Sequence, residues 1–135
     1  MEIFNSIFDT KERVLSTIEH AASPYEVYDE FYRDIEADTN LFFLLRTGES
    51  EVFEDADGGE FLVREGNFVL TVYARQSWME ISNNKTTFQQ KVHTVRSALK
   101  RAGLNVTDIL PIGDVDNTGF MTYAINIFAI YRDCD

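Results

Sequence analysis

The stretch that decides the fold is Asn67-Phe-Val-Leu-Thr-Val-Tyr-Ala-Arg75. Its residues are mainly β-branched or aromatic, and they alternate between two faces with a period of two. One face would carry Phe68, Leu70, Val72 and Ala74, and the other would carry Val69, Thr71 and Tyr73. This composition and period predict a strand with two distinct faces. We therefore expect residues 67–75 to be the central strand of a sheet.

A helical pattern follows this strand, over residues 86–102. Its apolar residues recur at spacings of three and four, and Gly103 is placed to end the helix. The stripe consists of Phe88, Val92, Val95 and Leu99. Residues 119–131 return to strand composition, with Met121, Tyr123, Ile125, Ile127, Ala129 and Tyr131 on one face. Strand, amphipathic helix and strand together predict a two-layer α+β domain in which the helix covers one face of the sheet.

Length and composition indicate one globular domain over residues 1–135. A hydrophobic content of 44% with 13% aromatic residues argues against disorder. No apolar run approaches the length of a membrane-spanning helix, and the N-terminus lacks a basic region and a cleavage site. We expect a soluble, unexported protein without membrane contact. Because Cys134 is the only cysteine, an intrachain disulfide or a thiolate-rich metal site is excluded.

Two helices are expected in the N-terminal third. The first would lie within residues 1–22 with Phe4, Phe8, Leu15 and Ile18 facing inward, unless Asp9-Thr10 caps it and starts it later. The second would begin at the capping box Ser23-Pro24-Tyr25-Glu26 and run to about Ala37. Its aromatic surface is more typical of a core than of a ligand cage, and it comprises Tyr25, Tyr28, Phe31, Tyr32 and Ile35.

The middle of the chain predicts strands and turns. Leu41–Arg46 is short and apolar, which favours a buried strand. Shorter strands are expected at 51–54, 60–64 and 104–112, with turns at 55–59, 64–67 and 113–119. Asp-Gly-Gly at 57–59 is typical of a hairpin, because glycine reaches positive φ without strain. The fold class is therefore α+β: a mainly antiparallel sheet of four or more strands packed against helices, with a projecting acidic hairpin.

Motifs that would indicate catalysis or a cofactor are absent from the sequence. Asp114-x-Asp116 resembles the start of a calcium loop, but Ile125 stands where the bidentate Glu is needed, so a hairpin turn is favoured. His20 and His93 lie on separate predicted helices without a metal-ligand pattern. Phosphate-binding glycine loops and nucleophile elbows are also missing. We expect no enzymatic activity, no cofactor and no metal.

The net charge of −11 is unevenly distributed along the chain. Residues 1–60 contain 16 acidic and 4 basic side chains, whereas residues 61–135 contain 7 acidic and 8 basic ones. This distribution counts against a protein that grips nucleic acid, because such proteins bind phosphates with Lys and Arg. A solvated surface that keeps the protein soluble is the simplest interpretation.

A family resemblance lies in three segments of the second half. Phe68-Val-Leu-Thr-Val-Tyr-Ala74, then a helix ending Leu99-Lys-Arg-Ala-Gly-Leu104, then an Asp-rich turn and Phe120-Met-Thr-Tyr-Ala-Ile-Asn-Ile-Phe128 resemble the tail-completion or tail-terminator proteins of long-tailed bacteriophages. The likeness covers about half of the chain and concerns the order of elements. It implies a structural virion protein of the neck, made in the host cytoplasm. Such subunits form a ring, usually of six, that ends the tail tube and joins the tail to the head connector.

The resemblance gives the acidic residues a possible role. An arm around Glu49 to Glu60 would project toward a neighbouring subunit or ring, and carboxylates would line a channel through which DNA slides without binding. The interface and channel candidates are Glu49, Glu51, Glu54, Asp55, Asp57, Glu60, Asp114 and Asp116. The expected partners are copies of the same chain, the tail tube protein and the head connector or head-closure protein.

Three alternatives remain open from the sequence. Another neck component, such as a head-closure or adaptor protein, would show the same features. An acidic inhibitor that mimics DNA is compatible with the charge, although mimics usually spread acidity over a whole surface. A small-ligand domain would place Tyr73, His93, Tyr123 or Tyr131 in a pocket, but no convergent polar groups indicate one.

Overall fold

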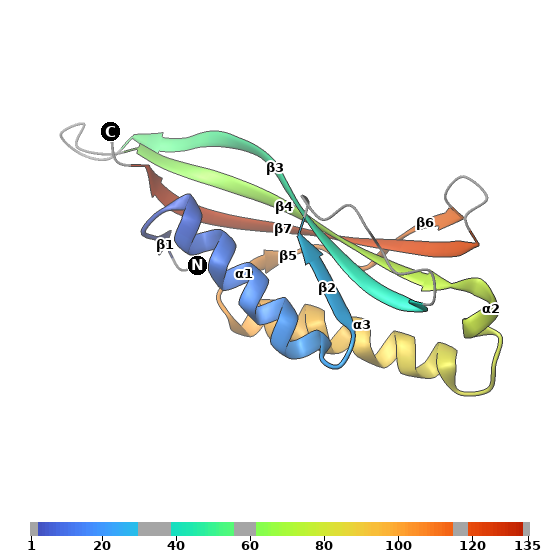
Figure 1. The fold of residues 1–135 in the computed structure, drawn as a ribbon. Helices are drawn as coiled ribbons and strands as arrows, with labels where there is room; N and C mark the ends of the chain where they lie inside the picture. The colour runs from blue at the N-terminus through green and yellow to red at the C-terminus, as the bar shows by residue number, and fades with distance from the viewer. Residues whose placement is uncertain (1–2, 30–38, 56–61, 115–118, 134–135) are drawn as a thin grey trace.

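A computed structural model describes residues 3–29, 39–55, 62–114 and 119–133, and for residues 49–55, 62–63, 113–114 and 133 it describes the backbone alone. Its helices are α1 (Ile7–Ala22), α2 (Gln76–Met79) and α3 (Asn84–Arg101). Its strands are β1 (Ile3–Phe4), β2 (Glu26–Asp29), β3 (Leu41–Asp55), β4 (Leu62–Arg75), β5 (Asn105–Val106), β6 (Leu110–Asp114) and β7 (Phe120–Asp133). Two layers result, a long curled sheet and, on one face of it, the two long helices (Figure 1).

The sheet is mixed and is built around β7. The strand order is β1-β7-β4-β3-β2, and β5 and β6 also pair with β7. β1 is parallel to β7 and β2 is parallel to β3, whereas the other described pairs are antiparallel. Helices packed on a sheet of at least four strands are therefore confirmed. The expectation of a mainly antiparallel sheet is wrong, because both parallel strands come from segments that were expected to be helical.

Helix α3 confirms the predicted amphipathic helix and its end. The four residues of the apolar stripe, Phe88, Val92, Val95 and Leu99, are all buried. Gly103 has φ = 88°, and its N–H donates to the carbonyl oxygen of Lys100 at 3.1 Å. The N–H of Leu104 donates to the carbonyl oxygen of Leu99 at 3.2 Å, which completes a Schellman motif. The side chains of Leu99 and Leu104 are both buried at this end of the helix.

Helix α1 starts earlier than Asp9-Thr10 and presents a different face from the one expected. Ser6 is its N-cap, and the Ser6 Oγ accepts a hydrogen bond from the Asp9 N–H at 3.1 Å. The buried residues are Thr10, Val14, Ile18 and Ala22, spaced four apart. Ile18 is thus confirmed as inward, whereas Phe8 is 80% exposed and Phe4 is buried on β1. Phe8 misses the core because it lies roughly 120° around the helix from Val14.

The second helix expected after Ser23 is not formed where the structure describes the chain. The Ser23-Pro24 peptide bond is cis, and residues 26–29 form β2. Val27 and Tyr28 pair with Phe43 and Leu44 of β3, so sheet pairing takes precedence over the local capping pattern. Tyr28 is buried, as a core interpretation requires. Phe31, Tyr32 and Ile35 lie outside the described residues.

Strands β3 and β4 are longer than the sequence predicts. The segment 51–54 continues the buried strand that begins at Leu41, and the expected turn at 64–67 lies inside β4. The two strands pair from Leu41↔Ala74 to Asp55↔Leu62, with register shifts between Thr47 and Ser50 and between Val52 and Glu54. Residues 56–61, which connect them, lie outside the described residues. The acidic hairpin at this connection therefore stays a prediction.

Gly66, which was expected in a turn, and Gly48 lie where another chain segment approaches closely. Gly66 is buried in β4, and a Cβ there would lie 3.2 Å from Cε1 of Tyr131 and 3.3 Å from Cδ1 of Ile7. The aromatic ring thus occupies the space that a side chain would need. Gly48 likewise faces the backbone oxygen of Asn67, at 3.1 Å from a would-be Cβ.

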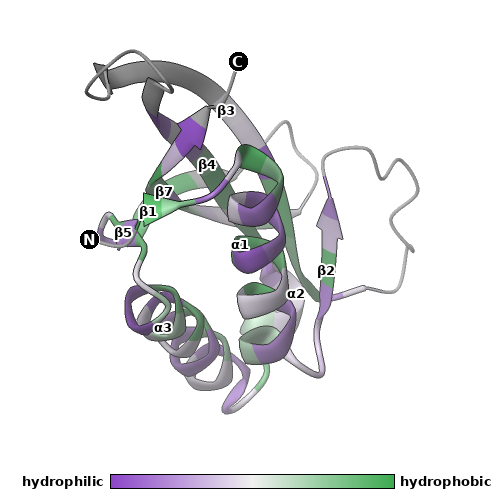
Figure 2. Cartoon of the chain, turned by 90° about the vertical axis from the view of Figure 1, so that its left-hand side faces the viewer, coloured by the Kyte–Doolittle hydropathy of each residue, from purple (hydrophilic) through white to green (hydrophobic). Residues whose placement is uncertain are grey.

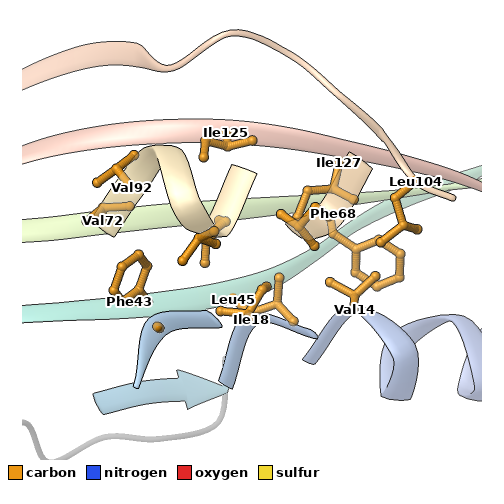
Figure 3. Close-up of a cluster of buried hydrophobic side chains, with 14 of the residues drawn as sticks. Val14, Ile18, Phe43, Leu45, Phe68, Val72, Val92, Leu104, Ile125 and Ile127 are labelled. Carbon is orange, nitrogen blue, oxygen red and sulfur yellow. The ribbon is translucent and has the colours of Figure 1, made fainter. Parts of the chain in front are cut away.

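The core lies between the sheet and the two helices, and it confirms the predicted strand faces. The inward face of β4 is fully buried through Phe68, Leu70, Val72 and Ala74. On β7 the buried members of the predicted face are Ile125, Ile127, Ala129 and Tyr131. Figure 3 shows the strand side chains meeting those of the helices, with Val14 and Ile18 from α1 and Val92 from α3. Figure 2 shows α1 and α3 together on this side of the curled sheet.

A polar joint holds the segment between β5 and β6, where the sequence predicts one weak strand. The Thr107 N–H donates to the carbonyl oxygen of Asn126 at 3.0 Å, and the Asn126 N–H donates back to the Thr107 Oγ1 at 3.0 Å. Arg96 Nε of α3 donates to the carbonyl oxygen of Thr107 at 2.8 Å. The hydroxyl thus replaces a backbone acceptor of the ladder, and the joint fixes β6 relative to α3.

Replacing Gly66 with valine should destabilise the protein, because the new side chain would collide with the Tyr131 ring and with Ile7. We expect the free energy of unfolding in urea to fall by about 1–3 kcal/mol. Gly66→Ala should cost less, since Cδ1 of Ile7 and the ring can each move by a few tenths of an ångström. Equal stability of the valine variant and the parent would contradict the close approach of Tyr131.

Replacing Thr107 with valine keeps the shape of the side chain but leaves the Asn126 N–H without its acceptor. We expect a loss of about 1–3 kcal/mol in the free energy of unfolding. Thr94→Val is the matched control, because its hydroxyl donates to the Gln90 carbonyl on an exposed helix surface, and should stay within about 0.5 kcal/mol of the parent. If both variants lose the same stability, the joint has no special role.

Candidate functional site

The structure separates the predicted acidic residues into two groups. Glu49, Glu51, Glu54 and Asp55 lie in the second half of β3, and Asp114 ends β6. Asp57, Glu60 and Asp116 lie outside the described residues. Asp55 is in register with Leu62 and so with Asp133, whereas Asp114 is in register with Met121 at the other end of β7. Twelve residues of strand separate these positions by roughly 40 Å, so the two groups do not form one site.

The acidic half of β3 lies at one end of the molecule. There β3, β4 and β7 continue together beyond α1, at the left of Figure 1. The backbone of Glu49–Asp55 is paired with β4 through this region. A neighbouring molecule could therefore reach this end of the sheet without displacing α1 or α3.

A basic surface on α3 was missed by the sequence analysis. The helix carries five Lys and Arg residues together with His93, and it contains no Asp or Glu. Lys91 donates to the carbonyl oxygen of Ser23 at 2.8 Å, and Arg96 takes part in the joint with Thr107. The remaining cations are Lys85, Lys100 and Arg101, and all three are exposed. The signal was present in the sequence as an 18-residue run without acidic residues, in a chain of net charge −11.

A hollow of about 390 Å³ lies beside α3. Its lining consists of Phe88, Gln89, Val92, His93, Arg96, Asp108, Ile109 and Tyr123. The floor is apolar, and polar side chains form the rim. The Arg96 Nη2 lies 3.3 Å from Asp108 Oδ1, but the Asp108 side chain is 93% exposed, so this ion pair contributes little to stability.

The hollow brings together two of the four residues named for a small-ligand domain. His93 and Tyr123 line it, whereas Tyr73 and Tyr131 do not. Tyr131 lies over Gly66, and Tyr73 stacks on Phe42 with ring centroids 4.7 Å apart. Since Arg96 is engaged by backbone and Asp108, the polar groups of the rim do not converge on one point.

The stacked pair belongs to an aromatic cluster that crosses the sheet. Phe42 also meets Tyr28 and Phe120 edge-on, with centroids 5.7 and 5.5 Å away. Arg75 lies 4.6 Å above the Phe120 ring, a cation–π distance. Because Phe42 is only 2% exposed, the cluster ties β2, β3, β4 and β7 together and is not an open binding surface.

Edge strand β6 presents apolar side chains to solvent. Leu110 is 45% and Ile112 is 56% exposed, and Pro111 between them lacks a backbone N–H. Proline is typical of an edge strand, where its missing donor faces away from the ladder. The antiparallel pairing of β6 with β7 also fits the predicted hairpin turn after Asp114, although residues 115–118 lie outside the described residues.

Within residues 3–29, 39–55, 62–114 and 119–133, no group of three or more His, Cys, Asp or Glu side chains is arranged to hold a metal ion. In the same part of the chain, no helix has the length and apolar character needed to cross a membrane.

Comparison with known proteins identifies the fold. No protein-family model matches the chain, and no curated protein matches it. Among solved structures, the chain is similar to a protein of an extracellular contractile injection system, in a cryo-EM structure described as the PVC sheath/tube terminator in extended state. The superposition has a TM-score of 0.56 at 9% sequence identity, and it covers 99% of this chain and 59% of the other. This chain thus spans 59% of the length of that neighbour, and the two share a fold over this length.

Proposed function

We propose that this chain is a structural virion protein that forms a ring, closes the end of a tail tube and joins the tail to the head connector. The observation that carries the proposal is the fold likeness to a sheath/tube terminator over 99% of the chain. That likeness agrees with the resemblance of the second half of the sequence to phage tail terminators. A ring of six copies is the expected form, with the tail tube protein as the partner on one side.

The sheet edges support assembly by head-to-tail contacts. Edge strands β2 and β6 lie on opposite sides of the long pair β4 and β7, and β6 exposes Leu110 and Ile112. A contact between two different surfaces of identical subunits forms a ring when the rotation between neighbours closes. Exposed edges with apolar side chains are suited to such contacts.

The charge distribution is compatible with passage of DNA through the ring. The first sixty residues carry most of the acidic excess, and Glu49–Asp55 includes four carboxylates. Carboxylates that face a channel repel phosphates and prevent DNA from sticking to the wall. In this proposal DNA passes without specific binding, and the protein acts without catalysis or a cofactor.

A terminator is favoured over a head-closure or adaptor protein by the same comparison, since the solved neighbour is a terminator. A DNA-mimicking inhibitor is disfavoured by α3, because exposed Lys85, Lys100 and Arg101 interrupt the acidic surface that a mimic needs.

The proposal predicts that the purified 15.5 kDa subunit assembles into closed rings and binds the ends of tail tubes. Native mass should be measured over a concentration series, and negative-stain images should be taken of the largest species alone and mixed with tail tubes. We expect a mass near six subunits and one cap per tube end. An unrelated protein of similar mass and similar negative charge is the control for nonspecific adsorption to the tail tubes. A species that stays monomeric and leaves tube ends bare would overturn the proposal.

A further inference from the structure

The basic surface of α3 includes a stripe of polar side chains that has a lysine at each end. Lys85, Gln89, His93, Arg96 and Lys100 follow one another at spacings of four, four, three and four, which places them on one side of the helix. At 1.5 Å per residue the stripe is about 22 Å long. Lys85 and Lys100, at its two ends, form no ion pair within the described part of the chain.

The stripe borders the hollow, so the two features form one surface. Gln89, His93 and Arg96 belong to both, and the apolar floor between them comes from Phe88, Val92, Ile109 and Tyr123. A compact anion would not use the apolar floor, and an apolar ligand would not use the lysines. The surface is suited to an extended segment that carries carboxylates together with apolar side chains.

The second half of β3 has this composition. Glu49-Ser-Glu-Val-Phe-Glu-Asp55 contains four carboxylates, two apolar residues and no Lys or Arg. Its backbone is a strand, so seven residues extend about 20 Å, close to the length of the stripe. Charge and length therefore both match the basic surface.

The acidic half of β3 cannot lie along the whole stripe of its own chain. Asp55 lies at the end of the sheet where Leu62 pairs with Asp133. Lys85, in the first turn of α3, lies near the other end, since α2 and α3 follow Arg75, which pairs with Phe120. The helix then runs back along the sheet, and Lys100 precedes Asn105, which pairs with Phe128 of β7. Figure 1 shows the end of β3 beyond α1 on the left and α3 below the sheet toward the right. A contact that extends along the whole stripe to Lys85 therefore requires a second molecule.

We propose that the basic stripe of α3 and the adjoining hollow receive the acidic half of β3 from a second copy of the chain. The contact joins two different surfaces, so it is head-to-tail and can close into a ring. The inference rests on the proposed ring and names the surfaces that form it. Opposite charges on the two surfaces would also disfavour the wrong orientations, in which like charges meet.

The test uses two charge-reversed variants and their combination. Variant one is K85E/K100E on α3, and variant two is E51K/E54K on β3. Each variant alone brings like charges together at the contact, so we expect its self-association constant to weaken at least about tenfold in sedimentation equilibrium. An equimolar mixture of the two should associate again, because every contact in the mixture can pair opposite charges. The four-substitution chain should self-associate for the same reason.

Control variants distinguish loss of the proposed contact from effects of a changed net charge and from unfolding. E12K/E19K changes the net charge as E51K/E54K does, but on exposed positions of α1. Arg101→Glu reverses a cation of α3 that lies about 100° around the helix from Lys100. Both controls should associate as the parent does. Circular-dichroism melts of all variants verify that each one folds.

The outcomes distinguish this inference from the proposed function. Variants that associate like the parent, or a mixture that fails to recover association, would overturn the inference, and so would a parent that is monomeric at every concentration. Rings and capped tubes formed by both charge-reversed variants would leave the terminator proposal standing without this contact. Loss of duplex DNA binding in K85E/K100E, with association unchanged, would instead assign the stripe to nucleic acid.

Discussion

The structure depends on the pairing of β7 with β4. The two strands are in register without interruption from Leu62↔Asp133 to Arg75↔Phe120. An uninterrupted ladder keeps each side chain on one face along the whole length, since successive residues alternate. One face therefore supplies the apolar layer that α1 and α3 cover, and the outer edge of β7 is left to pair in turn with β6, β5 and β1. The helices, the hollow and the long acidic end of the sheet are all positioned by this pair.

The elements predicted well are those in which the spacing of apolar residues within the segment is enough to identify the helix or strand. The period of α3 and the alternation at Phe68 to Ala74 each repeat often enough to fix the element and its buried face. The segment after Ser23 has a clear local capping pattern, yet Val27 and Tyr28 pair with β3. Gly66 suggested a turn from its local sequence. In the structure it lies within β4, where the Tyr131 ring, 65 residues away in sequence, leaves no room for a side chain. Errors arose where distant contacts prevail over local preference.

The candidate site shows the same division. The acidic residues of β3 were identified from composition, but their separation from Asp114 by the length of β7 depends on register, which the sequence does not reveal. The apolar stripe of α3 predicts the helix and its buried face, whereas its basic surface is indicated by a different signal, the absence of Asp and Glu from all 18 residues. The hollow beside it could not be predicted, because it forms only where Ile109 and Tyr123, from segments distant in sequence, lie against α3.

Charge segregation along the chain has a consequence for association. If the carboxylates were spread evenly over the protein surface, their net charge would only make copies of the chain repel one another. Here Lys85, Lys100 and Arg101 lie on a helix without a single acidic residue, and the described fold holds that helix away from the acidic end of β3. Lys85 in particular lies near the Arg75 end of the sheet, so the acidic end of β3 cannot neutralise it within one chain. Contact between the basic surface of one copy and the acidic surface of another brings opposite charges together, whereas contact of either surface with itself brings like charges together.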